Sequence, residues 1–278
     1  MKKEQPKVYK GKIKAVIFDW AGTTVDYGCF APLIAVQEIF KKYQIEPTMK
    51  EIRKPMGLSK IEHITKMLKM RRIKKLWKEK YRKKPSKEDV LKLYAEFETT
   101  LLKMLPFYAK PINGVVETVN KLKARNIKIG TTTGYTREMI NIIEPLAKTH
   151  GYFPDSIVTS SDVQKGRPAP LMCFQNAVNL NVHPLQAIVK VGDTITDIKE
   201  GINAGMWSIG IIIGSSLLGL SEMETETMTD KEIKKKIKKT TKKYRKAGAH
   251  FVIRKMEELP GVIDEIEKRL SRGLKPGK

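Results

Sequence analysis

The sequence predicts an α/β protein with a parallel sheet and a helical cap inserted after the first strand. Short β-rich runs alternate with helical patterns along its 278 residues, as in proteins whose parallel strands are joined by crossover helices. Several of these runs end in a polar residue that precedes turn-forming types. The stretch after the first run is too long for a single crossover and has a helical pattern. A chain of this length can bury a full core and carry an inserted module.

Five β-rich runs are expected to form the sheet. In chain order they are KAVIFD from Lys14, IKIGTTT from Ile127, SIVTS from Ser156, AIVKVGD from Ala187 and SIGIII from Ser208. Open α/β sheets bind their ligands at the carboxyl ends of the strands. We therefore expect Asp19, Thr133 and Asp193 to lie around one crevice.

The region from about Gly28 to Tyr108 is expected to be the inserted cap. We place a helical cap domain at residues 28–107 and a catalytic core at 1–27 and 108–278. Within the cap, KMLKMRRIKKLWKEKYRKK predicts one basic helix with an apolar stripe. The residues of the stripe are Met67, Met70, Ile73, Trp77 and Tyr81.

The chain is strongly basic, with a formal charge of +24 and a pI near 9.8. Such a charge describes possible partners, which include nucleic acid, an anionic surface or a small anion, and says nothing of the fold. The tract DKEIKKKIKKTTKKYRKAG predicts a solvated helix that lays Ile233 and Ile237 on the core. Because no nucleic-acid reader motif accompanies the tract, we do not expect nucleic acid to be the partner.

Cysteine usage and hydropathy predict a cytoplasmic protein. Cys29 and Cys173 are too few for a disulfide scaffold, which favours a reducing compartment. The basic N-terminus lacks the apolar region of a signal peptide, because the run AVIF is interrupted by Asp19. The longest apolar run, MWSIGIIIGSSLLGL, is shorter than a spanning helix and contains glycines. We therefore expect no membrane segment.

Three fragments at strand ends suggest phosphoryl chemistry. They are DWAGTT, TTTGYTRE and VGDTITDIKEG, with KGRPAP before the last. Their order and spacing resemble those of the haloacid dehalogenase-like phosphotransferases. The resemblance implies a Rossmann-like core in which Asp19 is the nucleophile, while the Thr133 hydroxyl and the Arg167 guanidinium hold phosphoryl oxygens. Lys165 is an alternative to Arg167, but a guanidinium offers phosphate a bidentate contact.

The same resemblance implies a Mg²⁺ site made of Asp19, the backbone carbonyl of Ala21, Asp193 and Asp197. A carboxylate that attacks an anionic phosphoryl group is repelled by its charge, so a divalent cation is needed to offset the repulsion. Mg²⁺ prefers oxygen ligands and keeps several waters, which this set of residues allows. The sequence leaves open whether Asp197 binds the ion directly or through water.

Ala21 is a departure from the pattern of this superfamily. Its phosphatases carry an aspartate two residues after the nucleophile, where it protonates the departing oxygen. Without that acid, we expect the leaving group to be carbon and not oxygen. Breaking a C–P bond requires an electron sink, and the imine formed by a lysine and an aldehyde supplies one.

The cap segment KPMGLSKIEHITKML contains such a lysine and resembles the Schiff-base motif of the phosphonoacetaldehyde hydrolases. The resemblance spans nearly the whole chain. It implies hydrolysis of a small phosphonate, phosphonoacetaldehyde, to acetaldehyde and phosphate by a homodimer formed through the cap. Lys60 would form the Schiff base and His63 would be a general acid or base. The implied pocket residues are Met56, Gly57, Cys29 and Tyr135.

Lys60 must be neutral to attack an aldehyde, whereas a free lysine has a pKa of about 10.4. The letters SKIE fit a capping box with Ser59 as the N-cap and Glu62 as its partner, which places Lys60 in the first helical turn. The positive end of the helix and burial would both lower the pKa of Lys60. A pair with Glu62 would raise it, and the sequence leaves that direction open.

Two other functions remain as alternatives. One is a phosphatase or β-phosphoglucomutase-like relative that has lost its acid. The other is a basic nucleic-acid-binding protein without enzymatic activity. Ala21 together with Lys60 argues against the first, and the intact set of Asp19, Asp193 and Asp197 argues against the second.

Overall fold

A six-stranded parallel sheet organises the protein, which confirms the predicted α/β fold class. The computed structural model describes residues 9–55 and 60–277. The strands lie in the order β3-β2-β1-β4-β5-β6. Their bounds are β1 (Ala15–Phe18), β2 (Lys128–Thr133), β3 (Ser156–Thr159), β4 (Ile188–Gly192), β5 (Trp207–Ile211) and β6 (Phe251–Ile253). All five expected strands are present, whereas β6 was not predicted because three residues are too few to show a pattern.

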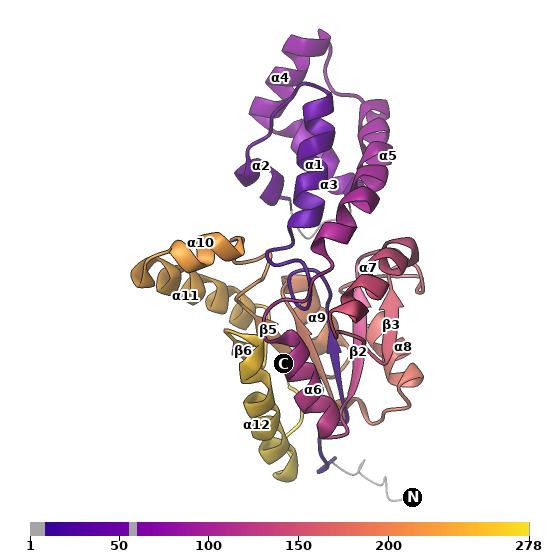
Figure 1. Cartoon of the computed structure of the whole chain (residues 1–278), viewed down its shortest axis with the longest axis vertical. Coiled ribbons are helices and arrows are strands. Elements are labelled where there is room, and N and C mark those ends of the chain that lie inside the picture. Colours follow the sequence, from indigo (N-terminus) through magenta and orange to yellow (C-terminus); the bar gives the residue numbers. More distant parts are fainter. Residues whose placement is uncertain (1–8, 56–59, 278) are drawn as a thin grey trace, which may run out of the picture.

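Helices cover both faces of this sheet (Figure 1). Val16 and Phe18 of β1 join one apolar cluster, while Ala15 and Ile17 join another, because successive strand residues point to opposite faces. The larger cluster packs α6 (Val115–Ala124), α7 (Arg137–Thr149) and α12 (Leu259–Ser271) on one face. The other face carries α8 (Leu171–Asn179) and α9 (Ile195–Asn203). Short 3₁₀ turns are η1 (Leu105–Tyr108), η2 (Leu185–Ala187) and η3 (Met256–Glu258).

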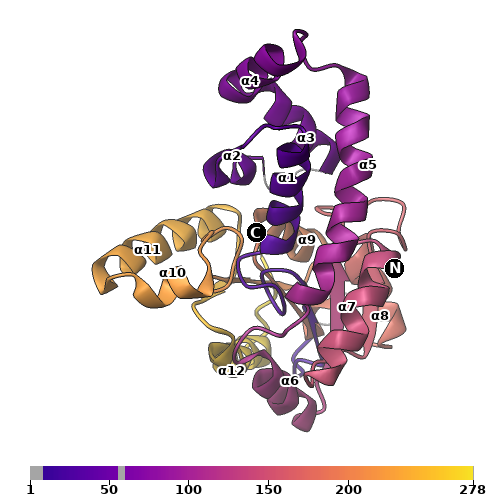
Figure 2. The same ribbon diagram turned by 45° about the horizontal axis from the view of Figure 1, so that its top comes forward.

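A second group of helices stands beyond the carboxyl ends of the strands (Figures 1 and 2). It comprises α1 (Phe30–Lys42), α2 (Met49–Arg53), α3 (Lys60–Lys69), α4 (Arg71–Tyr81) and α5 (Lys87–Met104). Helix α5 packs along α1 and α3, then leads through η1 back to the core. The chain therefore passes between the two groups near Gly28 and again near Tyr108.

The single basic helix expected over residues 66–84 is wrong. The chain forms α3 and α4 instead, with Met70 between them in an extended conformation (ψ 136°). The break redirects α4 so that Trp77 stacks on Tyr43 at a ring distance of 5.7 Å. Met67, Ile73 and Trp77 are buried as the stripe predicts. Periodicity therefore identified the buried face, while tertiary packing decided where the helix ends.

The Lys-rich tract forms α11 (Asp230–Lys246), which follows the short acidic α10 (Glu222–Thr227). Both helices project to one side of the sheet (Figure 1). Ile233 and Ile237 lie partly buried against a small apolar cluster that includes Tyr244. The lysines between them face solvent. Over the described ranges, none of the helices combines the length and apolar character that a membrane span requires.

Candidate active site

Asp19 follows β1 directly and lies between the ends of β2 and β4. The register pairs Phe18 with Thr131 on one side and with Val191 on the other. The Asp19 backbone N–H continues the ladder by donating to Val191 O at 3.0 Å. The Asp19 side chain is 7% exposed. A carboxylate in this position is held rigidly and opens toward the strand ends, where ligands bind in open α/β sheets.

The turn after Asp19 packs against the loop after β4. Thr24 Oγ1 donates to the Asp19 carbonyl at 3.0 Å, which closes the turn. Gly22 has a φ of +83°, and a Cβ at this position would lie 2.5 Å from Asp193 Oδ2. Glycine is therefore required here both by the backbone conformation and by the close approach of a carboxylate.

Arg167 reaches Asp19, the candidate nucleophile, from the loop before α8. Its guanidinium lies 2.7 Å from Asp19 Oδ1, 2.9 Å from Asp197 Oδ1 and 3.0 Å from Glu200 Oε2. Nη2 also donates to the carbonyl and hydroxyl of Thr132. Lys165, the alternative considered for this role, is exposed. The structure thus brings Arg167, and not Lys165, to the candidate nucleophile.

Two buried charges at this site, Lys190 and Glu200, were missed in the sequence. Lys190 Nζ lies 3.0 Å from Asp197 Oδ1 and 3.6 Å from Glu200 Oε2, and all three side chains are fully buried. A signal for Lys190 was present, because a lysine interrupts the otherwise apolar strand AIVKVGD. Glu200 stands three residues after Asp197 and hence on the same face of α9.

Asp19, Asp193 and Asp197 form a cluster that fits a divalent cation. Each contributes an oxygen, and these oxygens lie within 4.8 Å of one another. Asp193 Oδ2 accepts from the Ser216 backbone N–H at 2.7 Å and from its hydroxyl at 2.6 Å. Asp193 Oδ1 is buried and has no hydrogen-bond partner among residues 9–55 and 60–277. A buried carboxylate oxygen without a donor suits a cation.

Asp197 differs from Asp193 because both of its oxygens are already engaged. Oδ1 accepts a hydrogen bond from Lys190 and forms an ion pair with Arg167. Oδ2 completes a capping box with Thr194 at the start of α9. Asp197 thus orients the loop as well as contributing charge.

The pKa values of Asp19, Asp193 and Asp197 differ because the three acids have different charged neighbours. Burial raises the pKa of Asp193 well above its usual range, and the charges of Asp19 and Asp197 add to this effect. Burial also raises the pKa of Asp19, although Arg167 opposes it. For Asp197 the cations Arg167 and Lys190 outweigh burial and lower the pKa. A cation bound among these groups would lower the pKa of Asp193, because its charge opposes both the effect of burial and the repulsion from Asp19 and Asp197.

On the cap side, Lys60 is the first residue of α3 and His63 follows within one turn. Burial lowers the pKa of Lys60, and Cys29 and Asp26 act in the opposite direction. Burial, together with the charge of Lys60, lowers the pKa of His63 to about 4. His63 is therefore neutral near pH 7. Met56, Gly57 and Ser59, which the sequence places next to Lys60, lie outside the described residues.

The charges of the cap lysine and of the core acids both act on Cys29, and those of the core acids act on Tyr135. Burial raises the pKa of the Cys29 thiol well above its usual range, with further contributions from Asp26 and Asp193, while Lys60 lowers it. The pKa of Tyr135 is raised by burial and by Asp26, among other acids. Thr133, the last residue of β2, accepts from the Tyr135 backbone N–H at 3.1 Å. The structure therefore brings Cys29, Tyr135 and Thr133 to the junction of cap and core.

Asp26 is a further site residue that the sequence did not reveal. Its two carboxylate oxygens accept from the backbone N–H groups of Phe30 at 2.7 Å and Ala31 at 3.0 Å, at the start of α1. Burial raises the pKa of Asp26 to about 7, against the effect of these hydrogen bonds and of Arg53 and Lys60. Asp26 thus fixes the first cap helix to the core turn.

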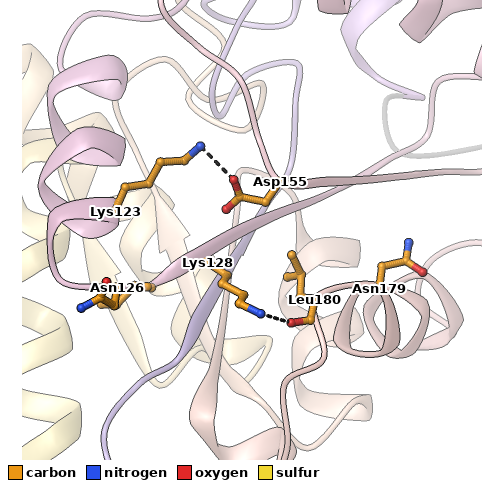
Figure 3. A pocket seen from close by; sticks show the side chains of 7 residues that line it. Lys123, Asn126, Lys128, Asp155, Asn179 and Leu180 are labelled. Carbon is orange, nitrogen blue, oxygen red and sulfur yellow. Dashed lines mark hydrogen bonds and ion pairs between the residues drawn. The ribbon is translucent and has the colours of Figure 1, made fainter.

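A surface hollow of roughly 450 Å³ lies elsewhere on the core (Figure 3). It is bordered by Lys123 paired with Asp155 at 2.9 Å, and by Lys128, which donates to the Leu180 carbonyl at 2.6 Å. Lys128 begins β2 and Asp155 precedes β3. The hollow is therefore at the amino ends of the strands, opposite Asp19, and is not a candidate for the active site.

The parallel sheet, the acid cluster at its carboxyl edge and the helical group above it define a hydrolase of the haloacid dehalogenase-like class. The family described as haloacid dehalogenase-like hydrolase matches residues 16–211. Phosphonoacetaldehyde hydrolases from Bacillus mycoides and Bacillus cytotoxicus are 52% and 53% identical over 93% of this chain and 98% of theirs. The chain belongs to this family, and within it to the phosphonoacetaldehyde hydrolases.

Two further relatives extend the comparison. A bifunctional phosphonoacetaldehyde hydrolase/aminoethylphosphonate transaminase from Clostridioides difficile is 56% identical over 94% of this chain, which spans only 41% of that longer protein. A crystal structure of a phosphonoacetaldehyde hydrolase-like protein from Oleispira antarctica superposes with a TM-score of 0.90 at 36% identity. The superposition covers 98% of this chain and 99% of the other. The fold is therefore shared over cap and core together.

Proposed function

We propose that this protein hydrolyses the C–P bond of phosphonoacetaldehyde, giving acetaldehyde and phosphate through a Schiff base on Lys60 and an aspartyl-phosphate on Asp19. One observation carries the proposal. A partly buried lysine with a lowered pKa lies in the cap, near the site where the core nucleophile is followed by Ala21 and not by an acid. The names of the close relatives agree with this activity.

The first half of the reaction takes place at the cap. The neutral amine of Lys60 adds to the aldehyde carbon, and loss of water leaves a protonated imine. His63 lies one turn from Lys60 and is neutral, so it can take up and return the protons of these steps. The imine allows the C–P bond to break, because the electron pair of that bond can move into the imine and form an enamine.

The second half takes place at the core. An oxygen of Asp19 bonds to phosphorus as the C–P bond breaks, while the pair from that bond forms the enamine. Arg167 lies 2.7 Å from Asp19 Oδ1 and can hold the phosphoryl oxygens, together with the Thr133 hydroxyl. The enamine takes a proton on carbon, and water then releases acetaldehyde and free Lys60. A second water hydrolyses the aspartyl-phosphate and restores Asp19.

Mg²⁺ is the cation we propose for the acid cluster. Asp19, the carbonyl of Ala21 and Asp193 would hold it, and Asp197 would act through water because its own oxygens are taken by Lys190, Arg167 and Thr194. When bound, the ion supplies positive charge that offsets the repulsion between the carboxylate and the phosphonate. Met56, Gly57, Cys29 and Tyr135 would line the pocket around the aldehyde.

Borohydride trapping tests the proposal directly. The protein is incubated with Mg²⁺ and phosphonoacetaldehyde, reduced, and mapped by mass spectrometry. A reduced adduct on the peptide that contains Lys60, together with phosphate release before reduction, is the expected result. An adduct on a different lysine, or phosphate release from ordinary esters in place of the phosphonate, would reject the Schiff-base assignment.

The finer features of assembly follow from the same proposal. Residues 28–107 form the cap and residues 1–27 with 108–278 form the core. The cap supports a homodimer, because Ile61 of α3 and Leu91 of α5 are 38% and 47% exposed. We place the enzyme in the cytoplasm and assign it no nucleic-acid partner. Light scattering on the purified protein, with and without nucleic acid, tests the dimer and the absence of that partner.

A further inference from the structure

Helix α11 consists mostly of exposed lysines but also contains a buried tyrosine, Tyr244. Tyr244 is fully buried, and its hydroxyl donates to the Asp193 carbonyl at 2.6 Å and to the Ile211 carbonyl at 2.8 Å. Asp193 directly follows β4, and Ile211 is the last residue of β5. The Lys-rich helix therefore reaches the loop that bears the acid cluster. We propose that Tyr244 and Ser216 are positioning residues that hold Asp193 in the geometry needed to bind the divalent cation.

Asp193 needs such support because of its neighbours. Its carboxylate lies near those of Asp19 and Asp197, within the 4.8 Å that also makes the cluster fit a cation. Three carboxylates this close repel one another when they are charged, and hydrogen bonds that hold the Asp193 side chain in place oppose that repulsion. A carboxylate that must first be reoriented binds a cation more weakly than one already in place.

Ser216 holds the carboxylate itself. Its backbone N–H and its hydroxyl both donate to Asp193 Oδ2, at 2.7 Å and 2.6 Å. Gly22 leaves room for the same oxygen, since a Cβ at this position would lie 2.5 Å from it. Within the part of the chain that the structure describes, Oδ1 is left without a partner. The hydrogen bonds to Asp193 Oδ2 therefore fix the position of Oδ1, the oxygen that remains available to bind a cation.

Tyr244 holds the backbone beneath that carboxylate. Its hydroxyl joins the carbonyls at the ends of neighbouring strands β4 and β5, which fixes the start of the loop. Its ring packs on Gly210 so closely that a Cβ at residue 210 would lie 2.7 Å from it. Because the ring is fixed by packing, Tyr244→Phe removes the hydroxyl bonds with little change in shape.

The effect expected is on metal affinity and not on the chemical step. Residues that orient a metal ligand typically change affinity by roughly 10–100-fold when they are removed. We expect Tyr244→Phe and Ser216→Ala each to weaken Mg²⁺ binding by about tenfold. At saturating Mg²⁺ the kcat of both variants should return to within about twofold of the wild-type value, because neither residue touches the reacting atoms.

The test is a Mg²⁺ titration of the full-length protein by calorimetry, without substrate. Tyr43→Phe is the matched control, since it removes a tyrosine hydroxyl bond to Glu96 Oε1 (2.7 Å) within the cap. The proposal is supported if both core variants bind Mg²⁺ about tenfold more weakly than the control, at a similar unfolding temperature. It is overturned if both bind Mg²⁺ as tightly as the control. If Tyr244→Phe does not fold, Ser216→Ala decides alone.

The choice of Mg²⁺ in this inference rests on the proposed function. Activity measurements show which of the two fails if one of them is wrong. The Mg²⁺ concentration for half-maximal phosphate release should rise in the two variants, while KM for the phosphonate stays the same. A kcat that stays low at saturating Mg²⁺ would contradict a positioning role. A wild type that binds Mg²⁺ but does not cleave phosphonoacetaldehyde would reject the proposed function and leave this inference standing.

Discussion

The core and the cap treat buried ionisable side chains in opposite ways. In the core, Arg167 and Lys190 lie within 2.7–3.6 Å of the carboxylates of Asp19, Asp197 and Glu200. In the cap, Lys60 has no ion pair among the described residues, and its Nζ lies 5.9 Å from the centre of the uncharged Phe97 ring. The core thus pairs its charges directly, whereas in the cap the effect of burial on the pKa of Lys60 outweighs the opposing effects of Cys29 and Asp26.

This difference corresponds to the two chemical tasks. A nucleophilic carboxylate and a phosphoryl-binding guanidinium must both be charged, and pairing keeps buried groups charged. An imine-forming lysine and a proton-transferring histidine must be neutral, and burial without a counter-ion favours the neutral form of a base. The pKa values of the bases agree with this division, since those of Arg167 and Lys190 are raised and those of Lys60 and His63 are lowered. The acid Asp19 does not follow it, because burial raises its pKa although Arg167 acts in the opposite direction.

Asp19→Asn tests the core half and should have the largest effect. The amide cannot attack phosphorus and is a poor ligand for Mg²⁺, so phosphate release should fall by roughly four orders of magnitude or more. Circular dichroism and the unfolding temperature check that the variant is folded. Turnover that survives in Asp19→Asn would remove the aspartyl-phosphate from the mechanism.

Lys60→Arg tests the cap half. Arginine retains a positive charge but cannot form an imine, so activity should fall by several orders of magnitude, each tenfold loss equal to about 1.4 kcal/mol of barrier. Borohydride should then give no adduct. If Lys60 acted only through its charge, the arginine variant would keep a substantial part of the activity, and the Schiff-base mechanism would be wrong.

Ala21→Asp tests the absence of an acid beside Asp19 in the core. The new carboxylate would stand beside Asp19, where like charges compete and one pKa rises. We expect about a tenfold or greater loss of C–P cleavage, with any gain confined to a phosphate ester, whose oxygen leaving group can use a proton. Ala21→Asn is the control of similar size without the charge. Equal losses in both variants would show a steric effect only.

The fold and much of the core site could be predicted because their signals are local. Asp19 and Asp193 each follow a recognisable strand and Thr133 ends one, and a parallel sheet brings such ends together. Lys190 and Glu200 lie close to these residues in sequence, yet their burial depends on contacts across β4, α9 and Arg167. Such contacts are not visible in a linear pattern.

The helix break at Met70, and the roles of Asp26 and Tyr244, could not be predicted for a related reason. Each depends on packing between segments that are distant in sequence or on a turn without a regular period. Tyr244 lies 51 positions from Asp193 and in a tract whose lysines suggest only solvent exposure. Lys60 was found through resemblance, and its lowered pKa follows from burial that only the folded cap provides.

Asp26→Asn tests the junction of the two halves through pH. The pKa of Asp26 is raised to about 7, so between about pH 4 and 7 the folded protein binds a proton that the unfolded chain has released. The stability from this group is full below pH 4 and is lost as pH rises through 7. The free energy of unfolding of wild type relative to Asp26→Asn should therefore fall by about 2 kcal/mol from pH 5 to 7.5.

Urea unfolding at both pH values measures this difference. The titration of His63, whose pKa is lowered to about 4, weakens the folded state as pH falls, but it contributes equally to both proteins and cancels. A difference that does not change with pH would mean that Asp26 remains charged in the folded state.

Substitution of the exposed lysines of α11 should have the smallest effect on activity. It tests whether a charged side chain must be buried to affect catalysis in this protein. Replacing Lys235, Lys238 and Lys242 by glutamine leaves Tyr244 in place and removes only solvent-facing charge. Exposed charges are screened by salt and contribute little at moderate ionic strength. We therefore expect kcat within about twofold of wild type at 0.15 M salt, measured by phosphate release. A loss above tenfold in a folded triple variant would show that these lysines act on the site from the surface. Pairing between buried groups would then not be what separates the charges that matter for activity from those that do not.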